Sequence, residues 1–138
     1  MITDRLLKLL KNKLISEEKV CFAYLFGSQA RQDAGNLSDI DIAIYLDNGI
    51  DGFRYRLHLI EAIIKIVKND KVDIIILNNA TLLMCHQVVK NGVVLKDDKR
   101  RRLDFETKVL GEYHDTEYLR NTQLSYMREH LRAGTYFG

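Results

Sequence analysis

The spacing of apolar residues predicts helices and strands in alternation along the chain. Leucines at positions 6, 7, 10 and 14 recur at helical spacing, so residues 3–15 are predicted to form an amphipathic helix. The run KVCFAYLF at 19–26 is short, apolar and rich in aromatic residues, as is typical of a buried strand. Residues 39–46 (DIDIAIYL) alternate between polar and apolar positions, which predicts a second strand.

Helices and strands also alternate in the second half of the chain. We expect a helix at 53–67, a third strand at 71–77, a short helix at 80–90, a short strand at 93–96 and helical structure from about residue 101. The pattern therefore predicts an α/β fold. It has a small mixed β-sheet of three to four strands, helices packed on one face of the sheet, and a helical C-terminal segment.

Length and charge narrow the class of protein. A chain of 138 residues is the usual size of one compact domain, so we expect a single domain over 1–138, with 101–138 as a helical C-terminal segment and flexible tail. The net charge of +2 is too small to indicate direct nucleic-acid binding. The one dense charge cluster, KDDKRRR at 96–102, fits a solvated turn into a helix, or a patch for a phosphate or a partner protein.

Cysteine usage and hydropathy bear on the compartment. Cys21 and Cys85 lie far apart in apolar surroundings, which favours buried free thiols in a reducing compartment. Lysines interrupt the N-terminal leucines, and no run approaches the roughly 20 apolar residues that cross a bilayer. We therefore expect a cytoplasmic protein without a membrane span.

A pair of aspartates carries the candidate chemistry. Asp39 and Asp41, separated by one residue on a strand, project from the same face. Each disfavours ionisation of the other, so folding alone does not reward the arrangement. A divalent cation such as Mg²⁺ does, because hard cations prefer carboxylate oxygens. Asp73, inside the apolar third strand, is the third candidate, since burying it there is costly without a metal or a partner.

Three carboxylates on adjacent strands can hold two metal ions about 3.5–4 Å apart, the spacing that serves in-line phosphoryl displacement. In that scheme Asp39 and Asp41 bridge the ions, and Asp73 is an extra ligand and candidate general base. Gly27 ends the first strand where backbone can approach a phosphate closely. A helical turn at 28–33 would add N–H donors, the Ser28 hydroxyl and the Arg31 guanidinium.

Each feature also has a plainer interpretation. Gly27-Ser28 can be an ordinary turn, Asp39 and Asp41 can protect a strand edge, and Asp73 can cap a helix or pair with Lys71. No spacing among the four histidines gives a metal pair. Tyr45, on the carboxylate face, either packs in the core or lines a nucleotide pocket. Tyr136 and Phe137 either dock to a partner or lie in a disordered tail.

The order of these features resembles a known family. Gly27-Ser28, ten residues and then Asp39-Ile40-Asp41 resemble the signature of the DNA polymerase beta-like nucleotidyltransferase superfamily. The string LFGSQARQDAGNLSDIDIAIYL is similar to its minimal nucleotidyltransferases, stand-alone antitoxins that accompany HEPN-domain toxins. The resemblance is densest over 20–77 and extends to about residue 110. One departure is Arg31-Gln32, where many relatives have Arg-Gly.

The resemblance implies a specific activity. Such proteins use Mg²⁺ and ATP, and the antitoxin branch transfers AMP to a tyrosine of the partner toxin, an RNase, which silences it. By position, Gly27 and Ser28 would bind the triphosphate, and Asp39, Asp41 and Asp73 would be the metal-binding carboxylates. Two alternatives remain open at this stage. The protein can be a non-catalytic antitoxin that occludes its toxin, or a small-molecule (antibiotic) nucleotidyltransferase, for which 138 residues leave little room.

Overall fold

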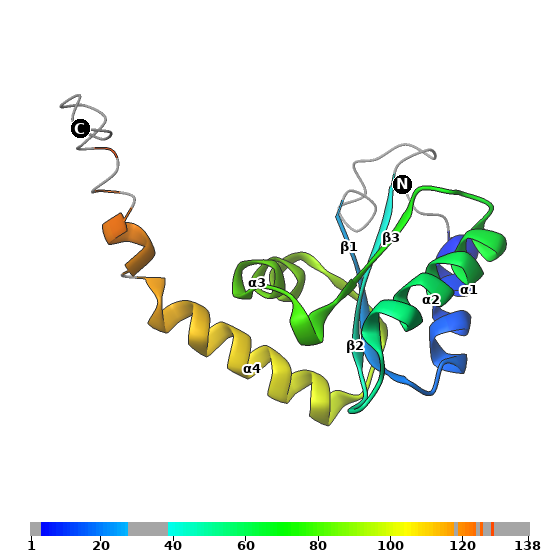
Figure 1. Ribbon diagram of the computed structural model, residues 1–138, viewed down its shortest axis with the longest axis horizontal. Coiled ribbons are helices and arrows are strands. Elements are labelled where there is room, and N and C mark those ends of the chain that lie inside the picture. The colour runs from blue at the N-terminus through cyan, green and yellow to red at the C-terminus, as the bar shows by residue number, and fades with distance from the viewer. Residues whose placement is uncertain (1–3, 28–38, 118, 124, 126–127, 129–138) are drawn as a thin grey trace.

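The structure is a computed structural model that describes residues 4–27, 39–117, 119–123, 125 and 128. In chain order its elements are α1 (Asp4–Ser16), β1 (Val20–Phe26), β2 (Ile40–Leu46), α2 (Gly52–Val67), β3 (Val72–Ile76), the 3₁₀ helix η1 (Leu77–Asn79), α3 (Leu82–Asn91), β4 (Val93–Lys96) and α4 (Lys99–Asp115). The four strands form one mixed sheet in the order β3-β2-β1-β4 (Figure 1). The predicted α/β class is confirmed.

Every helix and strand expected within the described residues is present, and side-chain caps explain where three helices begin. Asp51, Thr81 and Asp98 each accept a hydrogen bond from a backbone N–H three residues on, at the starts of α2, α3 and α4. At the other end of α2, Lys68 takes a left-handed conformation with a φ of 55°. The helical turn expected at 28–33 and the tail at 134–138 lie outside the described residues.

The sheet carries helices on both faces. As expected, α1 and α2 cover one face, where Leu10, Leu59 and Ile63 pack against the isoleucines of β2. The other face is partly covered by α3 and α4, whose Cys85, Val88 and Val109 pack against β1 (Figure 1). This second layer was not anticipated. Its reason lies in β1, VCFAYLF, which has no polar residue and therefore needs apolar cover on both sides.

The structure also shows the state of the two cysteines and the hydropathy of the described helices. Cys21 and Cys85 are buried and free, as predicted. No helix among the described residues is long and apolar enough to cross a membrane.

Beyond the body of the molecule, α4 continues away from the sheet, so that the described C-terminal part projects from it (Figure 1). The helix passes through Gly111 without a break and ends at Asp115.

Candidate active site

Strand register brings two of the three predicted carboxylates side by side. β2 and β3 run parallel, and their register places Asp41 opposite Asp73. The alternation along both strands puts these two residues on the face that carries α3 and α4, because their neighbours Ile42 and Ile74 belong to the other core cluster. Asp39 comes directly before β2 and is exposed. The three aspartates therefore gather at the amino ends of two adjacent strands.

Gly27, at the end of β1, completes this end of the sheet. Its φ is +78°, in the left-handed region that favours glycine. A Cβ at this position would lie 2.5 Å from Oδ2 of Asp41, so no larger residue fits without a shift. The neighbouring Phe26 pairs with Asp41 in the antiparallel ladder. The chain thus turns away from β1 with its backbone directly against the carboxylate, while Ser28 and Arg31 lie outside the described residues.

The charge of Asp41 is poorly compensated. Burial raises the pKa of its carboxyl above the ordinary value of 3.8, and the neighbouring charges of Asp39 and Asp73 raise it further. Within the described part of the chain, the Asp41 carboxylate has no hydrogen-bond or ion-pair partner. Such a half-buried carboxylate opposes folding unless something positive binds to it.

Asp73 is held by an arginine that the sequence analysis did not single out. Its Oδ1 accepts a hydrogen bond from Nη2 of Arg56 at 2.5 Å and another from the backbone N–H of Ile74 at 2.9 Å. The same guanidinium donates through Nε to the Ile74 carbonyl at 2.6 Å. The Asp73 side chain is 56% exposed, so the burial expected from its apolar neighbours is wrong, because β3 is an edge strand. The alternative pairing with Lys71 gives way to a pairing with Arg56 of α2. Nothing in the local sequence distinguishes Arg56 from its neighbour Arg54.

A family comparison decides the class of this site. Residues 8–101, more than half of the chain, match the model of the family described as "Polymerase beta, Nucleotidyltransferase". The matched region includes all three aspartates and Gly27. The chain belongs to the polymerase beta nucleotidyltransferase family. The predicted fold family and the predicted enzyme class are both confirmed.

Individual relatives of this nucleotidyltransferase include a protein adenylyltransferase and components of toxin–antitoxin complexes. The protein adenylyltransferase MntA of Shewanella oneidensis is 29% identical over 110 residues, 80% of this chain and 76% of the relative. A crystal structure of a toxin–antitoxin with AMP-PNP aligns with a TM-score of 0.73 at 24% identity, over 92% of this chain and 99% of that one. A complex of tri-AMPylated Shewanella oneidensis HEPN toxin with MNT antitoxin aligns with a TM-score of 0.69 at 25% identity, over 88% and 98%.

The carboxylates of this nucleotidyltransferase are the candidate ligands for a divalent cation. Among the described residues, no three acidic, histidine or cysteine side chains are already arranged around a common point. The chemistry of the carboxylates nevertheless fits a hard cation, because Asp41 has the charges of Asp39 and Asp73 beside it and no cationic partner among the residues that the structure describes. Asp73 has one oxygen engaged by Arg56, and within the described residues Oδ2 has no partner.

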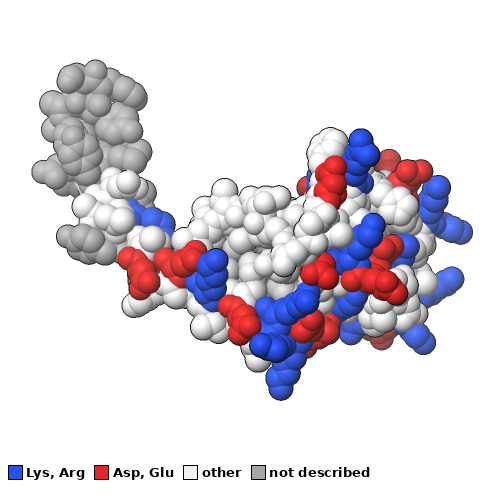
Figure 2. All heavy atoms as spheres, turned by 60° about the horizontal axis from the view of Figure 1, so that its bottom comes forward, with Lys and Arg blue, Asp and Glu red and all other residues white. Residues whose placement is uncertain are grey.

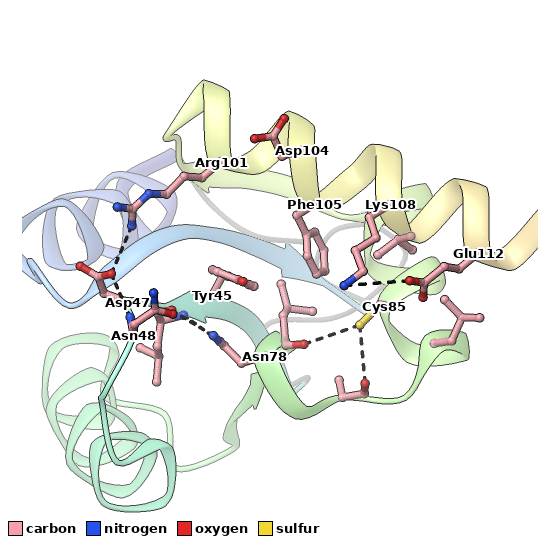
Figure 3. Close-up of a pocket in the computed structure, with 15 residues that line it drawn as sticks. Tyr45, Asp47, Asn48, Asn78, Cys85, Arg101, Asp104, Phe105, Lys108 and Glu112 are labelled. Atoms are coloured by element: carbon pink, nitrogen blue, oxygen red, sulfur yellow. Dashed lines mark hydrogen bonds and ion pairs between the residues drawn. The ribbon is translucent and has the colours of Figure 1, made fainter.

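A cavity of about 540 Å³ lies on the same face but at the opposite end of β2 (Figure 3). Its walls come from α4, η1 and the start of α3, and its floor includes Tyr45 and Phe105. Tyr45 shares the carboxylate face, as predicted, yet its ring stacks on Phe22 at 4.9 Å. Four residues along a strand separate it from Asp41 by roughly 13 Å. Tyr45 therefore lines this cavity at the carboxyl end of β2 and lies away from the carboxylates.

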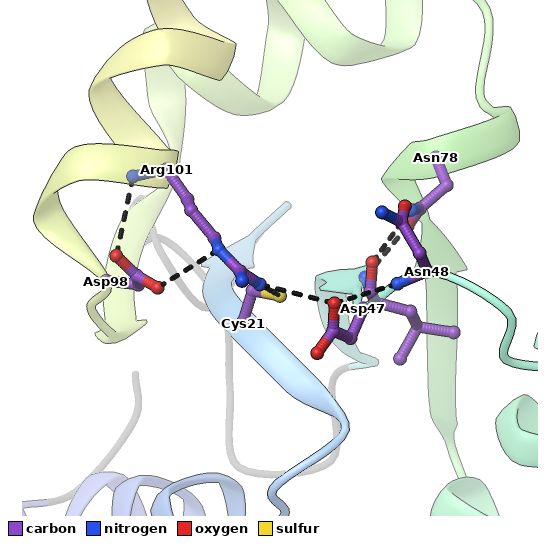
Figure 4. Close-up of polar contacts among 7 residues, drawn as sticks. Cys21, Asp47, Asn48, Asn78, Asp98 and Arg101 are labelled. Atoms are coloured by element: carbon purple, nitrogen blue, oxygen red, sulfur yellow. Dashed lines mark hydrogen bonds and ion pairs between the residues drawn. The ribbon is translucent and has the colours of Figure 1, made fainter.

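At this carboxyl end of β2, charged and polar side chains have hydrogen-bond or ion-pair partners (Figure 4). Arg101 lies 3.4 Å from Asp47 and 3.6 Å from Asp98, and its Nη1 also donates to the Cys21 thiol at 2.8 Å. The Asn78 side chain accepts from Leu46 N–H at 2.8 Å and donates to Leu46 C=O at 2.9 Å. The charge cluster at 96–102 thus opens α4, the first of its two expected roles. On the face drawn in Figure 2, positive and negative side chains are interspersed over the half of the body that holds α1 and α2.

Proposed function

We propose that this nucleotidyltransferase transfers AMP from ATP to a tyrosine hydroxyl of a cognate HEPN RNase toxin and thereby neutralises it. Two relatives support the proposal through what their names state: one is a protein adenylyltransferase, and the other is an MNT antitoxin in complex with an AMPylated HEPN toxin. An ATP donor and two free thiols also fit a cytoplasmic site of action.

One observation carries the proposal at the level of geometry. Gly27 and Asp41, fourteen positions apart in sequence, touch: backbone at the end of β1 lies against the Asp41 carboxylate. The glycine that would admit a phosphate and the carboxylate that would bind its counter-ion therefore belong to one site. Asp73, opposite Asp41 on β3, extends that site toward the edge of the sheet.

In the proposed reaction a tyrosine oxygen forms a bond to the α-phosphorus of ATP. The bond from that phosphorus to the bridging oxygen breaks, and pyrophosphate leaves with the bonding electrons. The hydroxyl proton passes to a carboxylate, for which Asp73 is the candidate because its Oδ2 is free within the described residues. Backbone at Gly27, with Ser28 and Arg31, would hold the triphosphate tail.

Asp39 and Asp41 would hold Mg²⁺, with Asp73 as a third carboxylate. When bound, the ion neutralises triphosphate charge and stabilises the leaving group. The protein's own part is to hold Asp41 on β2 and Asp73 on β3 opposite each other, so that little reorganisation is needed when the nucleotide binds. Burial, and then the charges of Asp39 and Asp73, raise the pKa of Asp41, so holding this carboxylate ionised has a free-energy cost in the protein alone.

The test uses the purified protein, the HEPN protein encoded beside it, ATP and Mg²⁺, with intact-mass spectrometry of the HEPN protein. We expect mass increments that match AMP, localised by fragmentation to tyrosine. Asp41→Asn should abolish them, whereas Asp104→Asn, an exposed aspartate of α4 without an ion pair among the described residues, should not. An inhibited toxin of unchanged mass would instead indicate occlusion.

A further inference from the structure

Arg56, an arginine of α2, forms an ion pair with Asp73 of the candidate site. Arg56 extends from α2 to the edge strand β3, where it contacts both Asp73 and the backbone of Ile74. The side chains of Arg56 and Asp73 are 33% and 56% exposed, so the ion pair lies at the surface, with its arginine half the more buried. The neighbouring Arg54, by contrast, is 89% exposed, and its one ion pair among the described residues is with Asp51 at the start of its own helix, at 3.7 Å.

Three groups close a ring at the edge of the sheet. The Ile74 N–H donates to Oδ1 of Asp73, Nη2 of Arg56 donates to the same oxygen, and Nε of Arg56 donates to the Ile74 carbonyl. Oδ1 of Asp73 is therefore fixed by two donors, one from backbone and one from a planar guanidinium. Fixing one carboxylate oxygen also fixes the direction of the other. Within the described residues, Oδ2 has no hydrogen-bond partner.

We propose that Arg56 is a positioning residue, which orients Asp73 so that its free oxygen serves the transfer reaction. This inference rests on the proposed function, because it gives Asp73 a role in that reaction. Groups that accept a proton or bind a charged substrate lose efficiency when misplaced by about 1 Å, and their supporting hydrogen bonds matter accordingly. A purely structural alternative is that the ring only protects the edge of β3.

The activity test compares Arg56→Gln, Arg56→Lys and, as the matched control, Arg54→Gln in the toxin-adenylylation assay. We expect Arg56→Gln to lower kcat by about 10–100-fold with the KM for ATP little changed. Lysine should restore part of the rate, because it can donate to Asp73 but cannot form the second bond of the guanidinium fork. Arg54→Gln should behave as the wild type. An Arg56→Gln protein with wild-type kcat would overturn the inference.

A double-mutant cycle separates positioning from general support of the fold. If Arg56 acts through Asp73, Arg56→Gln should cause no further loss of rate in an Asp73→Asn background. The same fold-loss in both backgrounds would mean that Arg56 works by another route, and would overturn the proposal.

A second readout does not depend on activity. In thermal unfolding without nucleotide or metal, the Tm shifts of Arg56→Gln and Asp73→Asn should be non-additive, because each substitution breaks the same ion pair. Additive shifts would show that the two side chains do not act together and would contradict the inference, even with a fully active wild type. A wild type that modifies no HEPN protein would defeat the proposed function, and with it the role of Arg56, while the cycle still reports whether the contact exists.

Discussion

The two ends of β2 carry similar residues in opposite circumstances. Asp47, just beyond the carboxyl end, accepts a hydrogen bond from the Asn48 N–H at 2.9 Å and lies 3.4 Å from Arg101. Asp41, near the amino end, faces two other carboxylates and has no partner among the described residues. One aspartate is thus compensated within the fold, and the other is not.

The contrast separates charges that support the fold from a charge that the fold tolerates. At the carboxyl end, Arg101 and Asn78 tie α4 and η1 to β2. At the amino end, the same strand places the Asp41 carboxylate against Gly27 and opposite Asp73. Burial, and then the charges of Asp39 and Asp73, raise the pKa of Asp41, and its ionised form disfavours the folded state. Removing the polar contacts at the carboxyl end should therefore lower stability and leave activity unchanged, whereas neutralising Asp41 should lower activity without lowering stability.

The largest expected effect is the loss of transfer in Asp41→Asn. Removing one preorganised electrostatic contact lowers kcat by about 10²–10³-fold, and we expect at least that much here. The Tm of the metal-free variant should stay equal or rise, because repulsion from Asp39 and Asp73 falls. Initial rates by mass spectrometry and calorimetric melting provide the two measurements. A clear drop in the metal-free Tm would assign Asp41 a structural role and remove the contrast.

Gly27→Ala should lower both the stability of the protein and the rate of transfer. The φ of +78° alone costs an alanine about 1–2 kcal/mol of unfolding free energy. The added Cβ would also meet Oδ2 of Asp41 and displace it, which should slow transfer further.

Gly49→Ala is the matched control, because Gly49 has a φ of +80° and nothing within 4 Å of its Cβ position. Gly27→Ala should lose at least as much stability as Gly49→Ala in urea denaturation, and only Gly27→Ala should lose activity. Equal activity in the two variants would argue against contact between β1 and the site.

At the other end of β2, Asn78→Ala should affect stability alone. It removes the two hydrogen bonds to Leu46 and leaves both backbone groups partly buried, for a loss of about 1–2 kcal/mol. The adjacent and exposed Asn79→Ala should be close to neutral, and both variants should keep the wild-type transfer rate. A slow Asn78→Ala enzyme would show that the two ends of β2 are coupled.

The smallest expected effect is a pH dependence with opposite signs at two carboxylates. Since the pKa of Asp41 is raised in the folded protein, its contribution to stability is lost as pH rises from below 3.8 through the folded pKa. The stability advantage of Asp41→Asn over the wild type should therefore be larger at about pH 6 than at about pH 3.

Glu17 provides the opposite case. Burial raises the pKa of its carboxyl, but hydrogen bonds from Lys13 and Tyr55 outweigh burial and bring it below the usual 4.5. Its stabilising contribution is present above pH 4.5 and is lost as pH falls through the folded pKa. The cost of Glu17→Gln should accordingly shrink in acid, as measured by urea denaturation at both pH values. The same trend for both variants would contradict these assignments.

Much of the fold could be predicted from periodicity because the helices and strands are short, regular and clearly bounded. The alternation in β2 correctly placed Asp41 and Tyr45 on the face opposite the isoleucines. The second helical layer was missed, although the wholly apolar β1 already indicated it. The turn η1 was missed as well, since three residues, Leu77–Asn79, give no periodic signal.

The residues of the candidate site also differ in how far the sequence alone predicts them. Asp39, Asp41 and Gly27 lie close together in the sequence motif, and local chemistry was enough to select them. The position of Asp73 opposite Asp41 depends on a parallel pairing whose register no local pattern specifies. Arg56 lies 17 residues from Asp73, and its role follows only from how α2 packs along the sheet edge. Ser28 and Arg31 remain predictions.

The most direct test of the central claim is the binding of Mn²⁺, as a probe for the divalent cation, followed by electron paramagnetic resonance in the presence of a non-hydrolysable ATP analogue. We expect saturable binding by the wild type and by Asp104→Asn, and a loss of about tenfold or more in affinity for Asp41→Asn. Equal Mn²⁺ affinity in all three proteins would contradict the claim that the amino end of β2 is a metal–nucleotide site.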